Sequence, residues 1–562
     1  MDSDYNPSRK SLIRNKWVTT LASIWIQCTS GSLYTFSIYS PILKSTQGYD
    51  QSTLDTISVF KDLGANTGLL SGMLYSATAT APGGGPWVVL LAGAVQCFAG
   101  YFLMWLTVTG ALPRPSAAAM CLYMLVAAHG MTFFNTANVV TGVYNFSSYS
   151  GTIVGIMKGF LGLSGAVLIQ VYRMIFKNKP SLFLLLLALL PPTNTLLLMR
   201  FVRIFRTNEE DEKKHLNSFS LLAVTLAVYL TAVIIIQNIF KLELSVRVFT
   251  FVLLILLLVS PIYVVIAAQR DKSYRLVKSL LEHNQISDER DQPDEDVMNI
   301  RQDHSEYQVV LNGSDQVTET TNGNLQWRDN LNLLQAMGTL NFWLLFYTTA
   351  CAMGSGLATV NNLSQIGEAL GCTTLEINTL VSLWSIWNFL GRFGAGYISD
   401  YFLHVKSCPR PLFIAVTLVV MALGHGTIAV GLPGALYAGS ILVGVCYGSQ
   451  WSLMPTIASE IFGKEHLGTI FNAITIASPV GSYILSVRVI GYFYDKEASE
   501  YENSCIGPQC FRTAFVIMAC VSFSGFIVAI VLHVRTAKFY VDVIVRRVLH
   551  SLRHSRVTDD LE

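Results

Sequence analysis

Charged residues are scarce in this chain of 562 residues. Asp, Glu, Lys and Arg together make up 13% of it, and the formal net charge is +2 at pH 7. A soluble domain usually carries about 25% charged residues. Hydrophobic residues reach 52%, and many of them form runs of about 20 residues, the length of a membrane-spanning helix. The composition therefore predicts an all-α polytopic membrane protein and argues against a soluble globular enzyme.

Several functional motifs are also missing from the sequence. It has no G-x-x-x-x-G-K-[ST] motif, so ATP-driven transport is not indicated. No Cys-x-x-Cys pair, Cys/His metal spacing, catalytic triad or pair of carboxylates at one depth occurs, so we expect no catalytic residue, no metal and no cofactor. No basic stripe interleaved with aromatic residues indicates a nucleic-acid partner. The charged N-terminal segment does not resemble a removable signal peptide, so the first apolar segment should target the chain.

Most of the 10 cysteines lie inside apolar runs, where they act as small hydrophobic residues. Cys505 and Cys510 instead share a late polar loop. They would form a disulfide if that loop is extracytosolic, and remain free thiols if it is not.

Apolar segments suggest fourteen membrane-spanning helices, with twelve as the alternative if the seventh and eighth segments pair differently. The segments are 17–43, 55–77, 87–109, 116–145, 149–175, 181–205, 218–240, 247–268, 338–365, 376–401, 411–431, 434–458, 467–494 and 511–535.

Lysine and arginine concentrate on one side of these segments, before the first, after the sixth, eighth and tenth, and in the C-terminal tail. Cytosolic loops carry an excess of these residues, so both chain ends are predicted to be cytosolic.

The sequence does not identify which membrane holds the protein, and we favour the plasma membrane over the vacuolar or endoplasmic reticulum membrane. The hydrophilic stretch before the ninth segment has no apolar period and is predicted to be a disordered cytosolic loop.

An internal repeat relates the two ends of the chain. Gly31-Ser32 recurs as Gly354-Ser355, and Gly151-Thr152-Ile153 recurs as Gly468-Thr469-Ile470. The repeat pairs helices 1–6 with helices 9–14 in the same orientation, which is typical of the major facilitator fold and predicts a 6+2+6 arrangement. The predicted units are a cytosolic N-terminus (1–16), a first six-helix half (17–205), an inserted helix pair (206–268), a disordered cytosolic loop (269–337), a second six-helix half (338–535) and a cytosolic tail (536–562).

Polar residues inside the apolar segments are candidates for a substrate site, because such groups are costly in lipid. In the first half we expect Asn135, Asn138 and Lys158 to meet at one depth, with Gln27 and Tyr34 on one face of helix 1. The alternative for Gln27 and Tyr34 is interhelical packing; for Lys158 it is a structural ion pair. The candidates in the second half are Asn361, Gln365 and Gln450.

Two further groups of charges suggest gating. Lys61 and Asp62 lie toward the outer third of helix 2, where they form an outer gate or, more simply, reach the interface. Arg392, Asp400 and Lys406 resemble the cytosolic loop motif of facilitators, in which a helix-end Asp and basic residues form a charge network that holds the cytosolic side closed. The matching loop of the first half, ATATAPGGGP, has no charge, so any such network is one-sided.

Long motifs resemble the plant nodulin-like branch of the major facilitator superfamily. They are WIQCTSGSLYTFSIYSPILKS, KDLGANTGLLSG, FFNTANVVTGVYNF, GTIVGIMKGFLGLSGA and NNLSQIGEALG. Two positions depart from what we expect of that branch. The pair Asn361-Asn362 stands where an Asp-Asn pair is expected, which puts proton coupling at that position in doubt, and Ser150 stands where an Arg usually precedes the Gly-Thr of helix 5.

The sequence therefore predicts a transporter that moves a small organic solute across the lipid bilayer by alternating access. Lys158 favours an organic anion such as a monocarboxylate, whereas the amides would suit a sugar. A coupling proton is a possible second partner, and we expect a monomer. The alternative is a transporter-fold regulator or receptor that signals through its cytosolic loop.

Overall fold

The computed structural model describes residues 15–49, 51–79, 84–176, 180–205, 212–240, 242–290, 330–497 and 505–559. Within these ranges every regular element is a helix and no strand occurs. The all-α class predicted from the composition is confirmed.

Six spans form the first half, and two of them are interrupted. Asn15 caps the first helix by accepting a hydrogen bond from the amide of Trp17. Ser116 caps the fourth span in the same way, through the amide of Ala119. The elements are α2 (Lys16–Thr29), η1 (Ser32–Thr35), α3 (Phe36–Gln47), α4 (Gln51–Asn66), α5 (Leu69–Thr78), α6 (Pro86–Val108), α7 (Ala117–Asn145), η2 (Ser147–Tyr149), α8 (Ser150–Ile175), α9 (Pro180–Leu198) and η3 (Met199–Phe201).

The inserted pair consists of α10 (Glu212–Ile239) and a return span made of α11 (Leu244–Val259) and α12 (Pro261–Arg290). Both spans are long and apolar enough to cross a membrane, which supports fourteen spans rather than twelve. The helix α12 runs to Arg290, so the expected disordered loop does not begin at residue 269. The rest of that predicted loop, up to residue 329, lies outside the described residues.

The second half repeats the six-span plan. Its second span, α16, begins with a capping box in which Thr373 and Glu376 satisfy each other's backbone amides. Its last helix, α22, is 51 residues long and continues well past the predicted membrane segment. The elements are α13 (Leu333–Met337), α14 (Leu340–Thr349), the π-helix η5 (Ala350–Gly354), α15 (Ser355–Ala369), α16 (Thr374–Lys406), α17 (Pro411–Val430), α18 (Pro433–Ile461), α19 (Leu467–Thr475), α20 (Ala477–Ser482), the π-helix η6 (Tyr483–Gly491), α21 (Tyr492–Glu497) and α22 (Gln509–Asp559).

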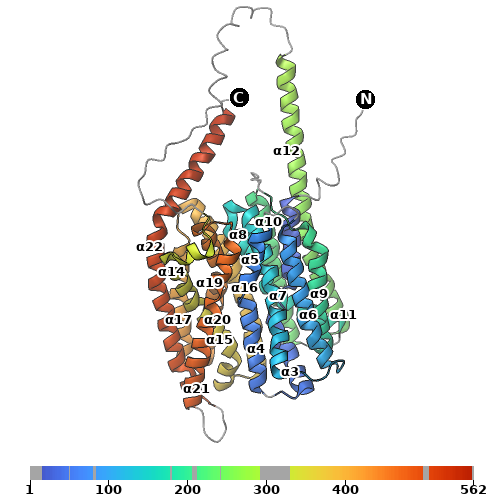
Figure 1. Ribbon diagram of the computed structural model, residues 1–562, viewed down its shortest axis with the longest axis vertical. Coiled ribbons are helices and arrows are strands. Elements are labelled where there is room, and N and C mark those ends of the chain that lie inside the picture. Colours follow the sequence, from blue (N-terminus) through green and yellow to red (C-terminus); the bar gives the residue numbers. More distant parts are fainter. Residues whose placement is uncertain are drawn as a thin grey trace, which may run out of the picture.

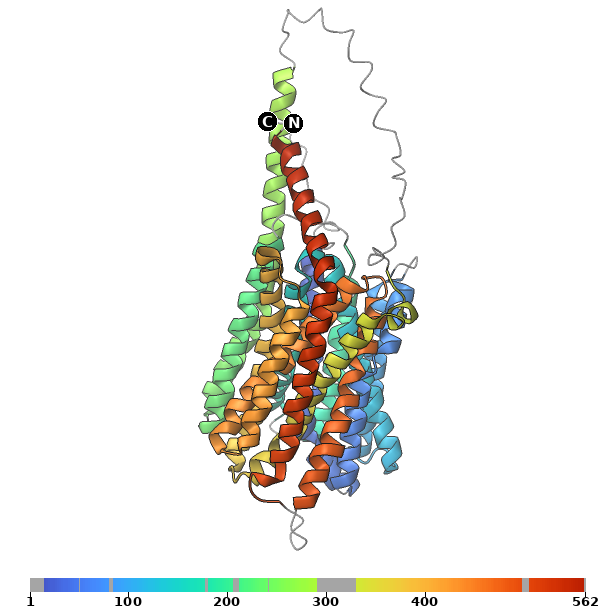
Figure 2. The same cartoon turned by 90° about the vertical axis from the view of Figure 1, so that its left-hand side faces the viewer.

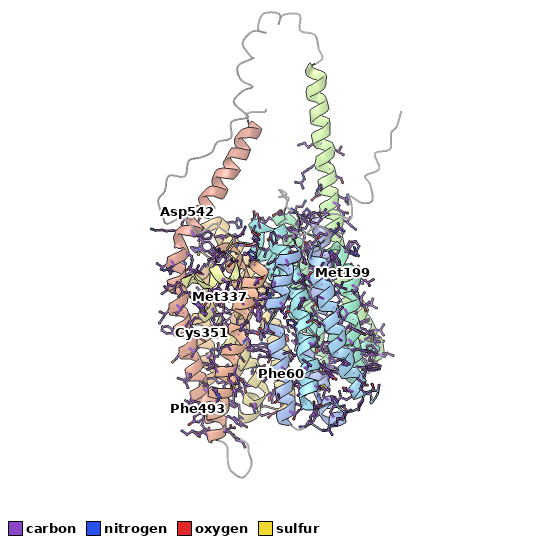
Figure 3. The ribbon with its side chains drawn as sticks, in the orientation of Figure 1. Phe60, Met199, Met337, Cys351, Phe493 and Asp542 are labelled. Carbon is purple, nitrogen blue, oxygen red and sulfur yellow. A yellow bond between two sulfur atoms is a disulfide. The ribbon has the colours of Figure 1, made fainter. Side chains whose placement is uncertain are left out.

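The two halves stand side by side with their spans roughly parallel (Figure 1). The helices α12 and α22 project from the same end of the bundle, as the rotated view also shows (Figure 2). We call this end the basic end, because it carries the basic segments that predict the cytosolic side. The other end, where α3 and α21 lie, is the opposite end. Side chains fill the interior of both halves, from around Phe60 in the first to around Cys351 in the second (Figure 3).

The first span breaks where it packs closely on α8. A Cβ atom at Gly31 would overlap the side chain of Ser164. The amide group of Asn194 on α9 donates to the carbonyl oxygen of Trp25 at 2.8 Å and to Oγ1 of Thr29 at 3.0 Å. The carbonyl of Trp25 and the hydroxyl of Thr29, near the break, therefore find a partner on a neighbouring helix, as an interrupted helix in a membrane requires.

The halves touch along two seams that lack side-chain bulk. On one seam, Gly151 and Gly155 of α8 face the backbone of α16 around Gly396. On the other, a Cβ atom at Gly72 of α5 would overlap the backbone of Gly468 on α19. The absence of side chains lets the helix backbones approach closely. The glycine ladder of helix 5 is thus a packing surface between the halves.

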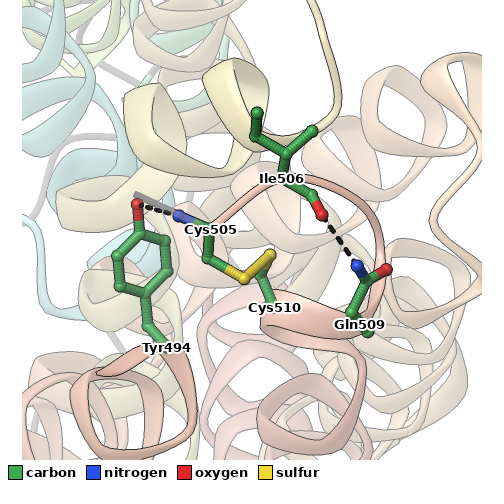
Figure 4. The surroundings of a disulfide bond; sticks show 5 residues. All are labelled: Tyr494, Cys505, Ile506, Gln509 and Cys510. Atoms are coloured by element: carbon green, nitrogen blue, oxygen red, sulfur yellow. Dashed lines mark hydrogen bonds between the residues drawn. A yellow bond between two sulfur atoms is a disulfide. The ribbon is translucent and has the colours of Figure 1, made fainter. Parts of the chain in front are cut away.

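At the opposite end, Cys505 and Cys510 are joined by a disulfide with an S–S distance of 2.00 Å (Figure 4). The amide of Cys505 donates to the hydroxyl of Tyr494 at 3.3 Å, and Nε2 of Gln509 donates to the carbonyl oxygen of Ile506 at 2.7 Å. The bond ties the segment that precedes α22 to the first turn of that helix.

We predict that Gly72→Ala lowers the thermal midpoint of the purified protein. The added methyl group would press on the backbone of Gly468, and overpacking typically costs about 1–3 kcal/mol. The matched control is Gly426→Ala on α17, where an added Cβ has nothing within 4 Å. Removing a helical glycine there should raise stability by up to about 1 kcal/mol. If Gly72→Ala melts at least as high as Gly426→Ala, the close seam is absent.

Candidate functional site

Lys158 is fully buried in α8, at the boundary between the two halves. It lies eight residues after the helix start, about 12 Å from the basic end of the helix. Its Nζ atom is 4.8 Å from the ring centroid of Trp451 on α18 and 5.1 Å from that of Phe471 on α19. Among the residues that the structure describes, Nζ has no hydrogen-bond partner. The ammonium of the first half therefore faces aromatic rings of the second half.

A second cation lies against the same tryptophan. The guanidinium carbon of Arg392 on α16 is 5.5 Å from the ring centroid of Trp451. Arg392 is 1% exposed and donates to Oδ1 of Asn388 at 2.8 Å and to the carbonyl oxygen of Lys158 at 3.2 Å. We call Lys158, Arg392, Trp451 and Phe471 the cationic cluster.

The chemistry of the cationic cluster favours a negatively charged partner. A cation–π contact stabilises a desolvated cation by about 2 kcal/mol or more. A lysine at the centre of a membrane costs roughly 2.5–3.5 kcal/mol on insertion scales, and a second cation beside it adds repulsion. The aromatic rings can offset the cost of burying one cation, but they do not remove the repulsion between two cations, whereas an anion would be attracted by both.

Three other first-half candidates also hold buried polar atoms without a partner among the described residues. They are both amide atoms of Gln27, Oδ1 of Asn135 and Oδ1 of Asn138. The amide nitrogen of Asn138 donates within its own helix to Phe134 at 2.8 Å. Buried polar atoms are almost always hydrogen-bonded in proteins, so each of these atoms needs a partner such as water or a solute.

Gln27 lies near the level of Lys158. The helices α2 and α8 run in the same direction, and Gly31 packs on Leu161 and Ser164. Gln27 is one turn earlier on α2, which corresponds to residues around 158–160 on α8 because the rise per residue is equal. The side chain of Tyr34 lies outside the described residues. Helix 1 thus contributes one candidate to this level, just before its break.

The second-half candidates lie elsewhere. Gln450 points toward α17, where its Nε2 donates to Oγ1 of Thr417 at 2.6 Å. Asn361 and Gln365 of α15 are exposed. Its neighbour Asn362 donates to the carbonyl oxygen of Ala358 and to Oγ of Ser486, both at 2.7 Å. The next residue, Trp451, is the one that contacts Lys158, and the role of Gln450 as a substrate-site residue stays a prediction.

A carboxylate joins the halves at the basic end. Asp400 of α16 accepts hydrogen bonds from the amides of Gly151 and Thr152, the first residues of α8. These amides have no partner within their own helix, and a helix N-terminus favours negative charge. Asp400 is also paired with the guanidinium of Arg410, at the start of α17. One carboxylate therefore links helix 5 of the first half to two helices of the second.

Arg410 extends this network through the second half. It is fully buried and donates to Oε1 of Glu460 on α18 and to Oγ of Ser399, at 2.8 and 2.7 Å. The hydroxyl of Tyr540 on α22 donates to the other oxygen of Glu460 at 2.8 Å. We call Asp400, Arg410 and Glu460, with the amides of α8, the charged latch.

Two members of the expected charge network lie outside the charged latch. Arg392 belongs to the cationic cluster, because it precedes Asp400 by two helical turns. Lys406 is exposed and its ammonium lies 6.0 Å from the ring centroid of its neighbour Phe402. In helix 2, Lys61 and Asp62 pair with each other at 3.2 Å, and the lysine lies over the ring of Phe36. Their predicted gating role stays a prediction.

The seam between α5 and α19 closes with neutral groups. Nδ2 of Asn472 on α19 donates to Oγ1 of Thr136 on α7 at 2.8 Å, and that hydroxyl lies 2.7 Å from Oγ of Ser71 on α5. A Cβ atom at Gly68 would overlap the amide of Asn472. The uncharged first-half loop thus corresponds to an uncharged seam, and the charged latch lies on the other seam.

Sequence reasoning missed Trp451 and Phe471 as partners of Lys158, and Arg410 and Glu460 as members of the charged latch. A signal for Arg410 was present, since it stands at the start of the helix after Asp400 and so returns to the same end of the bundle. No comparable signal identifies the two aromatic residues, because the rotation of α18 and α19 is set by packing.

Comparison with known proteins agrees with this architecture. The nodulin-like family model matches residues 16–266, and the model of the NFD4 C-terminal domain matches residues 330–542. The chain is 26% identical over 548 residues to the protein NUCLEAR FUSION DEFECTIVE 4 of Arabidopsis thaliana. The aligned region covers 93% of this chain and 89% of that protein. A shorter match, 29% identical, relates 31% of this chain to 38% of the probable transporter MCH1 of Candida glabrata.

A solved structure shares the fold. The proton:xylose symporter XylE, a major facilitator superfamily protein solved with bound 6-bromo-6-deoxy-D-glucose, superposes with a TM-score of 0.53 and 11% identity, over 94% of this chain and 96% of that one. At this identity the likeness shows the fold alone. Together with the family models, it assigns the chain to a class: it belongs to the nodulin-like family, and it is an integral membrane protein of the transporter type with the major facilitator fold.

Proposed function

We propose that the protein carries a small organic anion across the membrane by alternating access, with the cationic cluster as its binding site. The observation that carries this proposal is the fully buried ammonium of Lys158, which has no hydrogen-bond partner among the described residues and shares an aromatic ring with Arg392. A carboxylate at this place would meet two cations and could lay an apolar part on the rings of Trp451 and Phe471. This favours a carboxylate with a short carbon skeleton over a neutral sugar.

The position of the cationic cluster suits alternating access. Lys158 comes from the first half, and Arg392, Trp451 and Phe471 come from the second, so a bound anion would contact both halves. The charged latch and the neutral seam hold the halves together at the basic end. We infer that this end is cytosolic and that the structure represents the state closed on that side. Movement to the other state would then require the latch to open.

We expect Lys158→Gln to lower uptake of the transported anion by about tenfold or more. The substitution removes a charge-assisted interaction of about 1.5–3 kcal/mol and keeps a side chain of similar length. The assay is solute uptake by purified protein in liposomes. The solute is chosen by screening monocarboxylates, dicarboxylates and sugars for thermal stabilisation, because a ligand of the folded state raises the midpoint.

The matched control for that assay is Lys496→Gln, which removes an exposed lysine at the opposite end and should leave uptake unchanged. Stabilisation by sugars alone, together with normal uptake by Lys158→Gln, would contradict the anion site. If no solute moves in any assay, the result favours the alternative that the protein is a transporter-fold regulator or receptor.

We expect Asp400→Asn to weaken the charged latch. The variant keeps the shape of the side chain but loses the charge that faces Arg410 and the amides of α8. Hydrogen exchange at Gly151 and Thr152, followed by mass spectrometry, should be roughly tenfold faster or more, from an interaction of about 1.5–3 kcal/mol. Asp62→Asn on α4 is the control and should leave this peptide unchanged. Equal exchange in both variants would show that the carboxylate does not hold the halves together.

A further inference from the structure

A cleft of about 420 Å³ lies between α8 and the inserted helices, away from the cationic cluster. Its lining comes from the last turns of α8 and α10, the connection after α10 and the first turns of α11. Since α8 and α10 both begin at the basic end, the cleft lies near the opposite end of the bundle. None of the site residues named above lines it.

One wall of the cleft is polar and built from paired amides. The side chains of Gln170 on α8 and Gln237 on α10 exchange two hydrogen bonds, of 3.0 and 3.1 Å. Oε1 of Gln237 also accepts a hydrogen bond of 2.9 Å from the guanidinium of Arg173. Gln170 is buried and Gln237 is half-buried, and the pair holds the exposed Arg173 at the edge of the cleft.

A second guanidinium, that of Arg247 on α11, lines the same cleft. Within the described part of the chain, no carboxylate forms an ion pair with Arg173 or with Arg247. A snorkelling arginine would simply extend to water. Here Arg173 is instead held by an amide on a neighbouring helix, and both guanidinium groups keep donors for another partner.

The remaining lining is apolar and includes Met174, Phe240 and Phe251. Neighbouring residues of the inserted helices, such as Ile239 and Phe249, expose large apolar side chains. A surface of this kind, on helices long and apolar enough to span a membrane, faces lipid. The cleft therefore combines anion-binding groups at headgroup depth with an apolar wall that leads into the bilayer.

We propose that this cleft binds one phospholipid, with its phosphodiester held by Arg173 and Arg247 and an acyl chain lying against Phe240 and Phe251. Guanidinium groups present planar pairs of donors that match phosphate oxygens. The phosphodiester is common to zwitterionic and anionic phospholipids, so both kinds bind. The lipid connects helix 5 of the first half to the inserted pair.

The test is native mass spectrometry of the full-length purified protein, titrated with phosphatidylglycerol or phosphatidylcholine. The wild type is expected to retain one lipid of either kind at low concentration. The double variant Arg173→Gln/Arg247→Gln should bind about 100-fold more weakly, because each lost charged interaction of about 1.5–3 kcal/mol corresponds to roughly tenfold or more. The control is Arg512→Gln, an exposed arginine of α22 near the same end, and it should bind like the wild type.

A third arm uses soluble glycerol phosphate in place of lipid. Weak binding, at least 100-fold poorer than that of the lipids, supports the contribution of the acyl chain. Equal binding of glycerol phosphate would overturn the proposal in favour of a small-anion site. Equal lipid binding by the wild type and the double variant would also overturn it. These outcomes do not depend on uptake, so they are separate from the test of Lys158.

Discussion

The structure depends on how a lysine ammonium is accommodated inside a membrane protein. Lys158 is fully buried, and its neighbours are aromatic rings and a second cation. If stability alone mattered, we would expect a hydrophobic residue at this position, because burying a charge costs free energy. Its presence at the boundary between the halves is the reason for the proposed anion site. Both amide atoms of Gln27 and the Oδ1 atoms of Asn135 and Asn138 fit the same reasoning, because these buried atoms also lack a partner among the described residues.

The packing around Lys158 explains why glycine dominates its helix. Gly151 and Gly155 let α8 approach the backbone of α16, which brings Lys158 toward Trp451 and places the N-terminus of α8 against Asp400. Bulkier residues on that face would separate the halves. They would weaken both the contact of Lys158 with Trp451 and the contact of Asp400 with the N-terminus of α8. The glycine seam thus supports both the cationic cluster and the charged latch, which lie about two turns apart along α8.

Much of the fold and part of the site could be predicted from the sequence. Apolar segments and the internal repeat predicted the helical class and the two extra spans, because bilayer thickness constrains helix length. Lys158 could be selected because ionisable residues are rare in such segments. The choice between Gln450 and Trp451 could not be made, since adjacent helical residues point about 100° apart and tertiary packing sets the rotation. Arg392 was grouped with Asp400 because the segment resembles a facilitator loop motif, and that resemblance does not show the contact of Arg392 with Trp451, two helical turns away from Asp400.

The two seams differ in a way that bears on how the halves separate. On one side, opening breaks the charge-assisted contacts of Asp400 with two helix-terminal amides of α8, whereas the pair of Asp400 with Arg410 lies within the second half and stays intact. On the other, opening separates Gly72 from Gly468 and breaks neutral hydrogen bonds, from Asn472 to Thr136 and from Ser76 to the carbonyl oxygen of Glu465. In the proposed rocking motion both seams would part, and the charge-assisted contacts of Asp400 would contribute more to the barrier than the neutral contacts. Under the proposed function, an anion near Lys158 would bind beside the charged seam. Residues of both the cationic cluster and the charged latch lie on α8, α16 and α18, the last of which carries Trp451 and Glu460. Binding would therefore shift the equilibrium of the latch through these three helices.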